Sequence, residues 1–356
     1  MKKGWVEKKI KEFSATGGYQ KPDLHKDVLK LDSNENYVIP KQFQSDIISN
    51  ARKNSDVREY PLGGVERLVQ AIAKYLEVPT SMIGVGNGSD QILDLILSNF
   101  ASNETTVLTS NPTFGFFEER CKLYKIPVTA IPFSENMTLD AKEFSKQSKD
   151  ADILYLDSPN NPTGFQFSKN DIQKLIKSFD GLVIVDEAYG EFGDYSLSGM
   201  VKTTKNLVVV RTLSKSFGLA GLRLGYFVAN KDFASAFNQV LQYPYPLSTV
   251  TIEAGILALE KSSQIQTAVD TIKKERKRII ENLQKYDSFE VFDSKANFVL
   301  FDARGYYHRV YTALIEQGIS IRKLGKVGKH EGCLRVTVGT KEMNSKFLLA
   351  IRDLLG

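Results

Sequence analysis

The 356 residues of this chain, 42% of them hydrophobic, suffice for a sizeable core and two domains. The net charge of +5 is spread along the sequence without a block of like charges, which argues against a nucleic-acid-binding protein. Two cysteines without metal-ligand spacing, and no apolar run typical of a signal peptide or a membrane span, predict a cytoplasmic protein without a zinc site or a disulfide framework.

In chain order, residues 1–30 are polar and lysine-rich, and they predict a short helix followed by an extended arm. From about residue 60, helical and strand patterns alternate. "VERLVQAIAKYL" has apolar residues at helical spacing, and Ser89 begins the helical "SDQILDLILSNF" with Asp90 in its first turn. The apolar runs "TTVLTS", "ADILYLD", "GLVIVDEAY" and "NLVVVRT" are typical of strands covered on both faces, and a helical stretch over 168–178 lies among them. This alternation predicts an α/β fold with an open, largely parallel sheet.

After about residue 245 the pattern changes. "TIEAGILALEKSSQIQTAVDTIKKERKRIIENLQ" is a long, charged helical region of one or more helices, and it leads to two predicted strands, "ANFVLFDA" and "GCLRVTVGT". We therefore expect an N-terminal arm over 1–30, a large domain over 31–245 and a smaller α+β domain over 246–356. The cleft between the domains is the expected ligand site, because open α/β sheets bind ligands beyond the carboxyl ends of their strands.

Polar residues follow the strand within "VVVRTLSKSFGLAGLRLGYFVA", at residues 208–229. A lysine in a loop is ordinarily only solvated, but Lys215 has unusual neighbours. Thr212, Ser214 and Arg223 offer hydroxyl and guanidinium donors for a phosphate. Fixed cations favour the neutral, nucleophilic form of a lysine. A nucleophilic amine beside a phosphate site indicates a Schiff base with a phosphorylated aldehyde, pyridoxal 5′-phosphate (PLP).

Asp186 offers an independent indication, since PLP needs a buried carboxylate to keep its pyridine nitrogen protonated. It follows four apolar residues in "VIVDEAY", although an aspartate there also suits the end of a strand or the cap of a helix. Three residues later, Tyr189 is a possible donor to the phenolate oxygen of the ring. Asn161, in "SPNNPTG", is a possible second donor, although Asn, Pro and Gly are also what plain turns use.

Two further segments fit the same ligand. In "GNGSDQIL", Gly88 precedes a helix start, so the amides of Ser89 and Asp90 face an anion with the helix dipole behind them. A glycine-rich turn of this kind is weak evidence by itself. In "NPTFGFF", Phe114 is placed to stack on a ring, although an aromatic residue at such a position more often belongs to the core.

Together these segments resemble the fold-type-I PLP-dependent aminotransferases and, within them, the histidinol-phosphate aminotransferase family. The resemblance runs through nearly the whole chain and rests on ten segments in the family order. They are "LDSNEN", "REYPLGG", "GNGSDQILDLI", "NPTF", "SPNNPTG", "VIVDEAY", "RTLSKSFGLAGLRLGY", "YPYPLS", "ANFVLF" and "CLRVTVGT". The family implies a large, mostly parallel α/β/α domain and a smaller C-terminal domain.

The resemblance also implies a role for each matched residue. Lys215 is the Schiff-base lysine and the base that moves the substrate proton, and Asp186 pairs with the pyridinium nitrogen. The remaining cofactor positions are Asn161 and Tyr189 at the phenolate oxygen, Phe114 over the ring, and Gly88, Ser89, Asp90, Thr212, Ser214 and Arg223 around the phosphate. Tyr60, in "REYP", matches a tyrosine that reaches the cofactor phosphate of a neighbouring subunit, which implies a homodimer with shared active sites.

For the substrate, Arg335 matches an arginine that binds an acid group, and Arg322 matches a second arginine of the anion pocket. Either one alone is more often part of a surface ion pair. Tyr19 matches a tyrosine near the substrate phosphate, and Asn34 lies in a segment at the substrate entrance. The sequence departs from the family at "NENYVIP", where a proline and glycine usually follow the second asparagine, and at Phe114, which replaces a commoner tyrosine.

The expected activity is amino-group transfer between glutamate and imidazole acetol phosphate, which gives L-histidinol phosphate and 2-oxoglutarate. An aromatic aminotransferase is the alternative within this class. A PLP-dependent decarboxylase of a phosphorylated amino acid, such as threonine phosphate, is the alternative of another class, because it shares the lysine, the aspartate and the phosphate site. A PLP-retaining regulator is disfavoured, since only about 30 residues precede the motifs, too few for a DNA-binding module.

Overall fold

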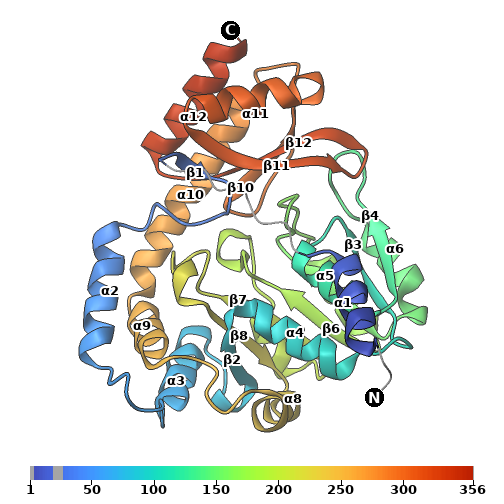
Figure 1. The fold of residues 1–356 in the computed structure, drawn as a ribbon, viewed down its shortest axis with the longest axis vertical. Helices are drawn as coiled ribbons and strands as arrows, with labels where there is room; N and C mark the ends of the chain where they lie inside the picture. The colour runs from blue at the N-terminus through green and yellow to red at the C-terminus, as the bar shows by residue number, and fades with distance from the viewer. Residues whose placement is uncertain (1–3, 19–26, 356) are drawn as a thin grey trace.

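The computed structural model describes residues 4–18 and 27–355, and in Figure 1 it has a larger lower part and a smaller upper part, each built on one sheet. The strands are β1 (Leu29–Leu31), β2 (Ile83–Asn87), β3 (Val107–Asn111), β4 (Val128–Pro132), β5 (Ile153–Asp157), β6 (Leu182–Asp186), β7 (Leu207–Thr212), β8 (Leu224–Ala229), β9 (Glu290–Val291), β10 (Phe298–Asp302), β11 (Ile319–Val327) and β12 (His330–Thr337). The α-helices are α1 (Trp5–Thr16), α2 (Lys41–Lys53), α3 (Gly64–Leu76), α4 (Gly88–Phe100), α5 (Gly115–Tyr124), α6 (Ala141–Gln147), α7 (Lys169–Ser178), α8 (Lys231–Ala236), α9 (Thr249–Glu260), α10 (Ser262–Leu283), α11 (Tyr307–Glu316) and α12 (Lys341–Leu355).

The larger sheet has seven strands in the order β2-β8-β7-β6-β5-β3-β4. β8 runs antiparallel to both of its neighbours, and the remaining pairs of adjacent strands are parallel. The apolar runs predicted as strands form β3, β5, β6 and β7, the last three of which are almost entirely buried. The sequence prediction of a largely parallel α/β sheet is therefore confirmed.

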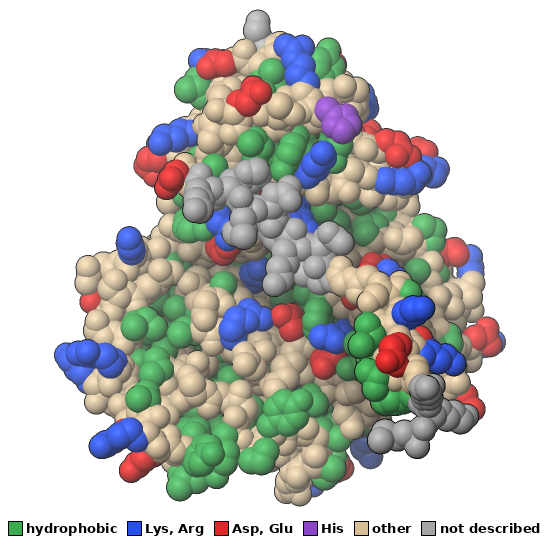
Figure 2. Space-filling view, viewed as in Figure 1, with side chains coloured by type: hydrophobic (Ala, Val, Ile, Leu, Met, Phe, Trp, Pro, Cys, Tyr) green, Lys and Arg blue, Asp and Glu red, His purple; other side chains and the backbone are tan. Residues whose placement is uncertain are grey.

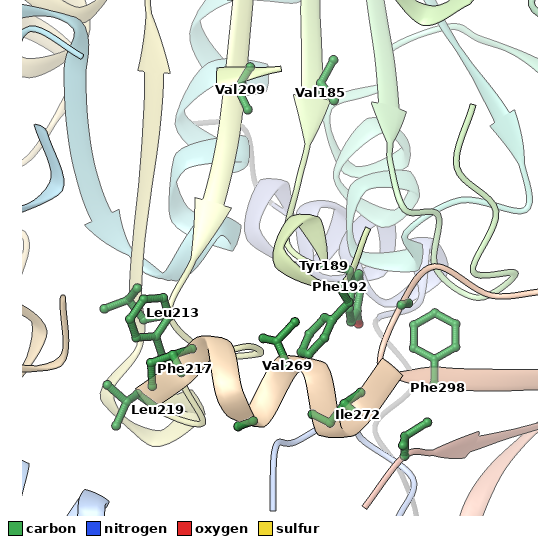
Figure 3. Packing of buried hydrophobic residues seen from close by; sticks show 14 of the residues in the cluster. Val185, Tyr189, Phe192, Val209, Leu213, Phe217, Leu219, Val269, Ile272 and Phe298 are labelled. Atoms are coloured by element: carbon green, nitrogen blue, oxygen red, sulfur yellow. The ribbon is translucent and has the colours of Figure 1, made fainter. Parts of the chain in front are cut away.

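Helices cover both faces of this sheet, which explains why its strands are apolar at successive positions. Because side chains alternate between faces, Val183 and Val185 join one hydrophobic cluster while Ile184 joins another. The first cluster takes in residues of α2, α3, α7, α9 and α10, and the second takes in residues of α4, α5 and α8. Figure 3 shows Val269 and Ile272 of α10 facing the aromatic residues that follow β6.

The smaller sheet has five strands in the order β1-β11-β12-β10-β9 and is packed against α11, which in turn contacts α12 (Figure 1). Its strand β1 comes from the N-terminal part of the chain and pairs in parallel with β11, with Leu29 opposite Ile319. The chain then passes from the smaller sheet to α2 of the larger part. The segment after β1 therefore connects the two parts beside the carboxyl edge of the large sheet.

Several boundaries differ from those expected. α4 begins at Gly88, one residue before Ser89, because the φ of +76° at Gly88 lets the chain turn directly from β2 into the helix. The long helical region after residue 245 is two helices, α9 and α10, separated at Lys261. The sequence patterns did not predict the strands β1, β2, β4, β8, β9 and β11. Within residues 4–18 and 27–355, no helix is long and apolar enough to cross a membrane.

Candidate active site

A cavity of about 300 Å³ lies where the large sheet meets the smaller one. Figure 2 shows Lys and Arg side chains on the surface between the two parts of the molecule. Thirteen of the predicted site residues line this cavity: Asn34, Ser89, Asp90, Phe114, Asn161, Asp186, Tyr189, Thr212, Ser214, Lys215, Arg223, Arg322 and Arg335. The fold thus brings together residues that are up to about 300 positions apart in the sequence.

Lys215 lies three residues beyond the end of β7, so the rigid strand places it at the carboxyl edge of the sheet. Its Nζ donates to the carbonyl oxygen of Ser33, 3.1 Å away, and lies 5.8 Å from the centre of the Tyr189 ring. The amine therefore reaches into the cavity between the segment after β1, which contains Ser33, and the Tyr189 ring. A primary amine in this place is available for covalent bonding to a carbonyl compound.

Asp186 is the last residue of β6, and its carboxyl group is buried. It accepts hydrogen bonds from the amide of Ala188 (2.9 Å) and the hydroxyl of Tyr155 (3.2 Å). Burial, followed by the charge of Asp157, raises the pKa of Asp186 to about 7. Among residues 4–18 and 27–355, no ion pair joins Asp186 to a cationic side chain. A buried carboxylate that lines a cavity suits a cationic ring nitrogen of a ligand.

Tyr189 and Asn161 approach the cavity from the loops after β6 and β5. The Tyr189 hydroxyl accepts a hydrogen bond from Asn34 Nδ2 at 2.8 Å, and burial raises the pKa of Tyr189 to about 12, so the hydroxyl keeps its proton at neutral pH. Asn161 Oδ1 accepts a hydrogen bond from the Arg335 guanidinium. Both polar groups are therefore held in place by hydrogen bonds before any ligand is present.

A cluster of donors surrounds the N-terminus of α4. The Thr212 hydroxyl donates to Ser214 Oγ at 2.9 Å, and the Arg223 guanidinium lies 3.5 Å from the same oxygen. Arg223 also donates to the Asp90 carboxylate at 2.7 Å. Hydroxyls, a guanidinium and the free amides of a helix N-terminus are the groups that bind phosphate.

Two glycines allow these donors to approach one another. A Cβ atom at Gly225 of β8 would lie 2.3 Å from the Ser89 nitrogen, and one at Gly88 would lie 2.6 Å from Arg223 Nη2. Backbone and guanidinium therefore come closer than side chains at these positions would permit. Gly88 does not itself line the cavity, and its position instead permits the contact between α4 and Arg223.

Arg322 and Arg335 lie side by side on the smaller sheet, because they are register partners on β11 and β12. Arg335 is buried, donates to the carbonyl oxygen of Asp32 at 3.1 Å, and stacks over the Phe298 ring at 5.0 Å. Two guanidinium groups at adjacent positions form a binding site for carboxylate or phosphate. Their strands thus place two guanidinium groups at the same cavity as Lys215 and Asp186.

Among the described residues, two predicted site residues do not line the cavity, Gly88 and Tyr60. Tyr60 is exposed and stacks on Tyr245, with ring centres 4.3 Å apart. Tyr19 lies outside the described residues. Conversely, the cavity wall includes Asp157, Asp32 and Ser33, which sequence reasoning did not single out. Asp157 ends the apolar run of β5 as Asp186 ends that of β6, and this parallel was the available signal.

The chain has the two-sheet architecture of a fold-type-I transferase. A lysine, a buried carboxylate and a cluster of donors suited to phosphate lie at the carboxyl edge of its large sheet. The sequence model of the family described as aminotransferase class I and II matches residues 26–351. The chain belongs to the aminotransferase class I and II family.

Relatives and solved structures agree with this class. A curated relative, the histidinol-phosphate aminotransferase of Pyrococcus furiosus, is 35% identical over 91% of this chain and 92% of its own length. The crystal structure of the histidinol-phosphate aminotransferase of Clostridium acetobutylicum has a TM-score of 0.84 at 28% identity, and the match covers 92% of this chain and 99% of that one. A third match is the Sinorhizobium meliloti histidinol-phosphate aminotransferase in complex with pyridoxal-5′-phosphate. Its TM-score is 0.83 at 22% identity, over 92% of this chain and 90% of that one, and it shows the shared fold.

Proposed function

We propose that this protein is a histidinol-phosphate transaminase, which transfers an amino group between glutamate and imidazole acetol phosphate to give L-histidinol phosphate and 2-oxoglutarate. The observation that carries the proposal is the placement of the paired Arg322 and Arg335 at the same cavity as Lys215 and Asp186. Glutamate has two carboxylates and histidinol phosphate has a phosphate. A pocket with two guanidinium groups serves both kinds of anion in turn.

The cofactor is PLP, and the described residues fit it chemically. Asp186 would hold the pyridine nitrogen, because a cation beside this carboxylate compensates its burial and restores its charge. Asn161 and Tyr189 would bind the phenolic oxygen, and Phe114 would cover the ring. The phosphate would be held by Ser89, Asp90 (through its amide), Thr212, Ser214 and Arg223.

PLP, when bound, withdraws electrons from the bonds at the substrate Cα. The residues of the chain supply the rest of the catalysis. Lys215 would hold PLP through its Nζ, and its free amine would move the proton from the substrate Cα to the cofactor carbon that carried the aldehyde, as amino-group transfer requires. Asp186 would keep the ring nitrogen protonated, and Tyr189 would donate its proton to the phenolic oxygen. Arg335 and Arg322 orient the substrate by its acidic groups, so that the Cα proton faces the lysine.

An aromatic aminotransferase would use the same cofactor groups, and so would a decarboxylase of threonine phosphate. The relatives of 30–35% identity over most of the chain carry the name histidinol-phosphate aminotransferase, which favours the first activity. The test supplies the PLP-loaded enzyme with histidinol phosphate plus 2-oxoglutarate, with phenylalanine plus 2-oxoglutarate, or with threonine phosphate alone. We expect rapid glutamate formation with histidinol phosphate. Carbon dioxide release without glutamate, or a preference for phenylalanine, would refute the proposal.

We also propose that the protein acts in the cytoplasm as a homodimer, in which Tyr60 reaches the partner's cofactor phosphate. The support is an exposed apolar surface that contains Val57 (77% exposed), Leu62 (82%) and Val240 (76%) together with the stacked Tyr60 and Tyr245. Figure 2 shows apolar side chains gathered over the region of α3 and α8. Such surfaces mark protein–protein contacts. Sedimentation should give a dimer that Leu62→Asp dissociates, and a monomeric wild-type protein would refute it.

A further inference from the structure

Three consecutive residues after β1 each contact a different functional side chain of the cavity. The carbonyl oxygen of Asp32 accepts from Arg335, and that of Ser33 accepts from Lys215, both at 3.1 Å. The side chain of Asn34 donates from Nδ2 to the Tyr189 hydroxyl at 2.8 Å. Asn34 thus touches a cofactor-site tyrosine, although the family resemblance places it only at the substrate entrance.

Asn34 is fixed by burial and by hydrogen bonds of both its backbone and its side chain. It is 1% exposed, and its backbone has a φ of +60°, a left-handed conformation that asparagine tolerates better than most residues. Its amide donates to Thr337 Oγ1 at 3.0 Å, and its carbonyl accepts from Asn297 Nδ2 at 3.0 Å. The Thr337 hydroxyl in turn donates to Asn34 Oδ1 at 3.3 Å. Because Oδ1 is occupied by Thr337, Nδ2 is the group directed at Tyr189.

The hydrogen bond from Asn34 determines where the proton of the Tyr189 hydroxyl can point. A tyrosine hydroxyl has a single proton and also accepts hydrogen bonds. Since Asn34 donates to this oxygen, the proton of Tyr189 is left to point elsewhere, and the hydroxyl lines the cavity. We propose that Asn34 is a positioning residue, which orients the Tyr189 hydroxyl so that its proton is donated to an anionic oxygen of the bound cofactor. This inference rests on the proposed use of PLP.

Asn34→Asp is the sharpest variant, because it keeps the shape and tolerates the left-handed backbone but replaces the donor by an acceptor. An aspartate would accept the Tyr189 proton and withdraw it from the cavity. The readout is the absorbance of the bound cofactor as a function of pH, without substrate. A lost donor destabilises the anionic oxygen, so the midpoint of this titration should rise, by about 1 pH unit. Tyr189→Phe should raise it in the same direction.

A double-mutant cycle shows whether Asn34 acts through Tyr189. Asn36→Asp is the matched control for added charge, because Asn36 is also buried and donates to the Ser216 carbonyl, not to Tyr189. In the Tyr189→Phe background, Asn34→Asp should move the midpoint no further than Asn36→Asp does. An equal effect of Asn34→Asp with and without the tyrosine hydroxyl would overturn the inference.

Two further outcomes distinguish a positioning role of Asn34 from a substrate contact and from a failure of PLP binding. If Asn34 instead contacts the substrate, Asn34→Asp would change KM for histidinol phosphate and leave the cofactor titration at the wild-type midpoint, which overturns the positioning role. A wild-type protein that shows no cofactor absorbance after incubation with PLP would refute both the proposed function and this inference. Should Asn34→Asp fail to fold, Asn34→Gly keeps the backbone conformation and removes the donor. Its midpoint should also rise, and a wild-type midpoint in Asn34→Gly would equally overturn the proposal.

Discussion

Asp157 and Asp186 are register partners at the ends of two adjacent parallel strands, and both carboxyl groups are buried beside the same cavity. Burial raises the pKa of Asp157 to about 6, and burial together with the charge of Asp157 raises the pKa of Asp186 to about 7. Asp157 accepts hydrogen bonds from the Thr113 hydroxyl, the Asn160 side chain and the Asn161 amide. Asp157 therefore holds the loops that present Phe114 and Asn161, while Asp186 has fewer hydrogen-bond partners and lines the cavity.

The first prediction concerns the pH dependence of the cofactor-free protein. Because the folded-state pKa of Asp186 lies above its ordinary value of 3.8, the folded state binds more protons between about pH 4 and 7. Its contribution to stability is highest below pH 4 and is lost as the pH rises to about 7. Asp186→Asn removes this loss. The free energy of unfolding of the variant, relative to that of the wild type, should therefore rise by up to a few kcal/mol from pH 4 to pH 8. Urea unfolding of both cofactor-free proteins at pH 4 and pH 8 measures this difference.

Asp180→Asn is the control, because Asp180 is exposed and its substitution should shift stability equally at both pH values. The same Asp186→Asn variant should bind PLP more weakly, since it loses the charge opposite the pyridine nitrogen. A stability difference from the wild type that does not change with pH would show that Asp186 titrates normally.

Sequence patterns predicted the strand ends well because a parallel sheet buried on both faces has nearly continuous apolar strands, and a polar residue where such a run stops is conspicuous. Asp186 and Asn161 were singled out in this way, and both line the cavity. The largely parallel sheet and the smaller C-terminal part follow from the same alternation of strand and helix. Their roles in binding remain predictions.

The contacts between distant segments could not be predicted, because hydrophobic periodicity contains no information on pairing partners. β1 is only three residues long and joins a sheet whose other strands lie more than 250 residues later. The bond from Asn34 to Tyr189 depends on that pairing, so it was equally invisible. The helix start at Gly88 was missed by one residue, because a positive φ at glycine leaves no mark in an apolar pattern.

A second prediction concerns Lys215→Ala. Without the amine, PLP has no covalent attachment, so the yellow absorbance of the bound cofactor and most of the turnover should be lost, while the dimer still forms. Borohydride treatment of the PLP-loaded wild type should leave the cofactor's mass on the peptide that contains Lys215. The control is Lys205→Ala, an exposed lysine before β7. Normal turnover in Lys215→Ala would remove this lysine from the mechanism.

Arg335→Ala tests the anion pocket. The substitution leaves an acidic group of the substrate without its cationic partner in a largely buried site, which costs at least about 2 kcal/mol, or a rise in KM for glutamate of about 30-fold. Steady-state kinetics measure it, and Arg352→Ala, an exposed arginine on α12, is the matched control. The cofactor absorbance should persist, because Arg335 belongs to β12 of the smaller sheet, whereas the covalent attachment of PLP is expected at Lys215. A KM within twofold of the wild type would argue against the assigned pocket.

The last prediction concerns a buried ion cluster on the opposite side of the strand ends from the cavity. Arg211 of β7 contacts Glu187 at 2.8 Å and Glu191 at 2.6 Å, and all three side chains are buried. Glu187 follows Asp186 and Arg211 precedes Thr212, so the ion pair joins the ends of β6 and β7 next to two proposed cofactor-binding residues. Arg211→Met would leave two carboxylates buried without their cation. We expect a loss of about 3–5 kcal/mol in the free energy of unfolding.

The pH dependence of that loss distinguishes a missing charge from a packing defect. Burial already raises the pKa of Glu187, and Arg211 is the main opposing influence. Without the arginine, the folded-state pKa of Glu187 rises further, so the variant should be less destabilised at pH 5, where the carboxyl group holds a proton, than at pH 8. Arg352→Met, which breaks an exposed pair with Asp353, should leave the unfolding free energy unchanged at both pH values. An equal loss for Arg211→Met at pH 5 and pH 8 would assign the effect to packing rather than to charge.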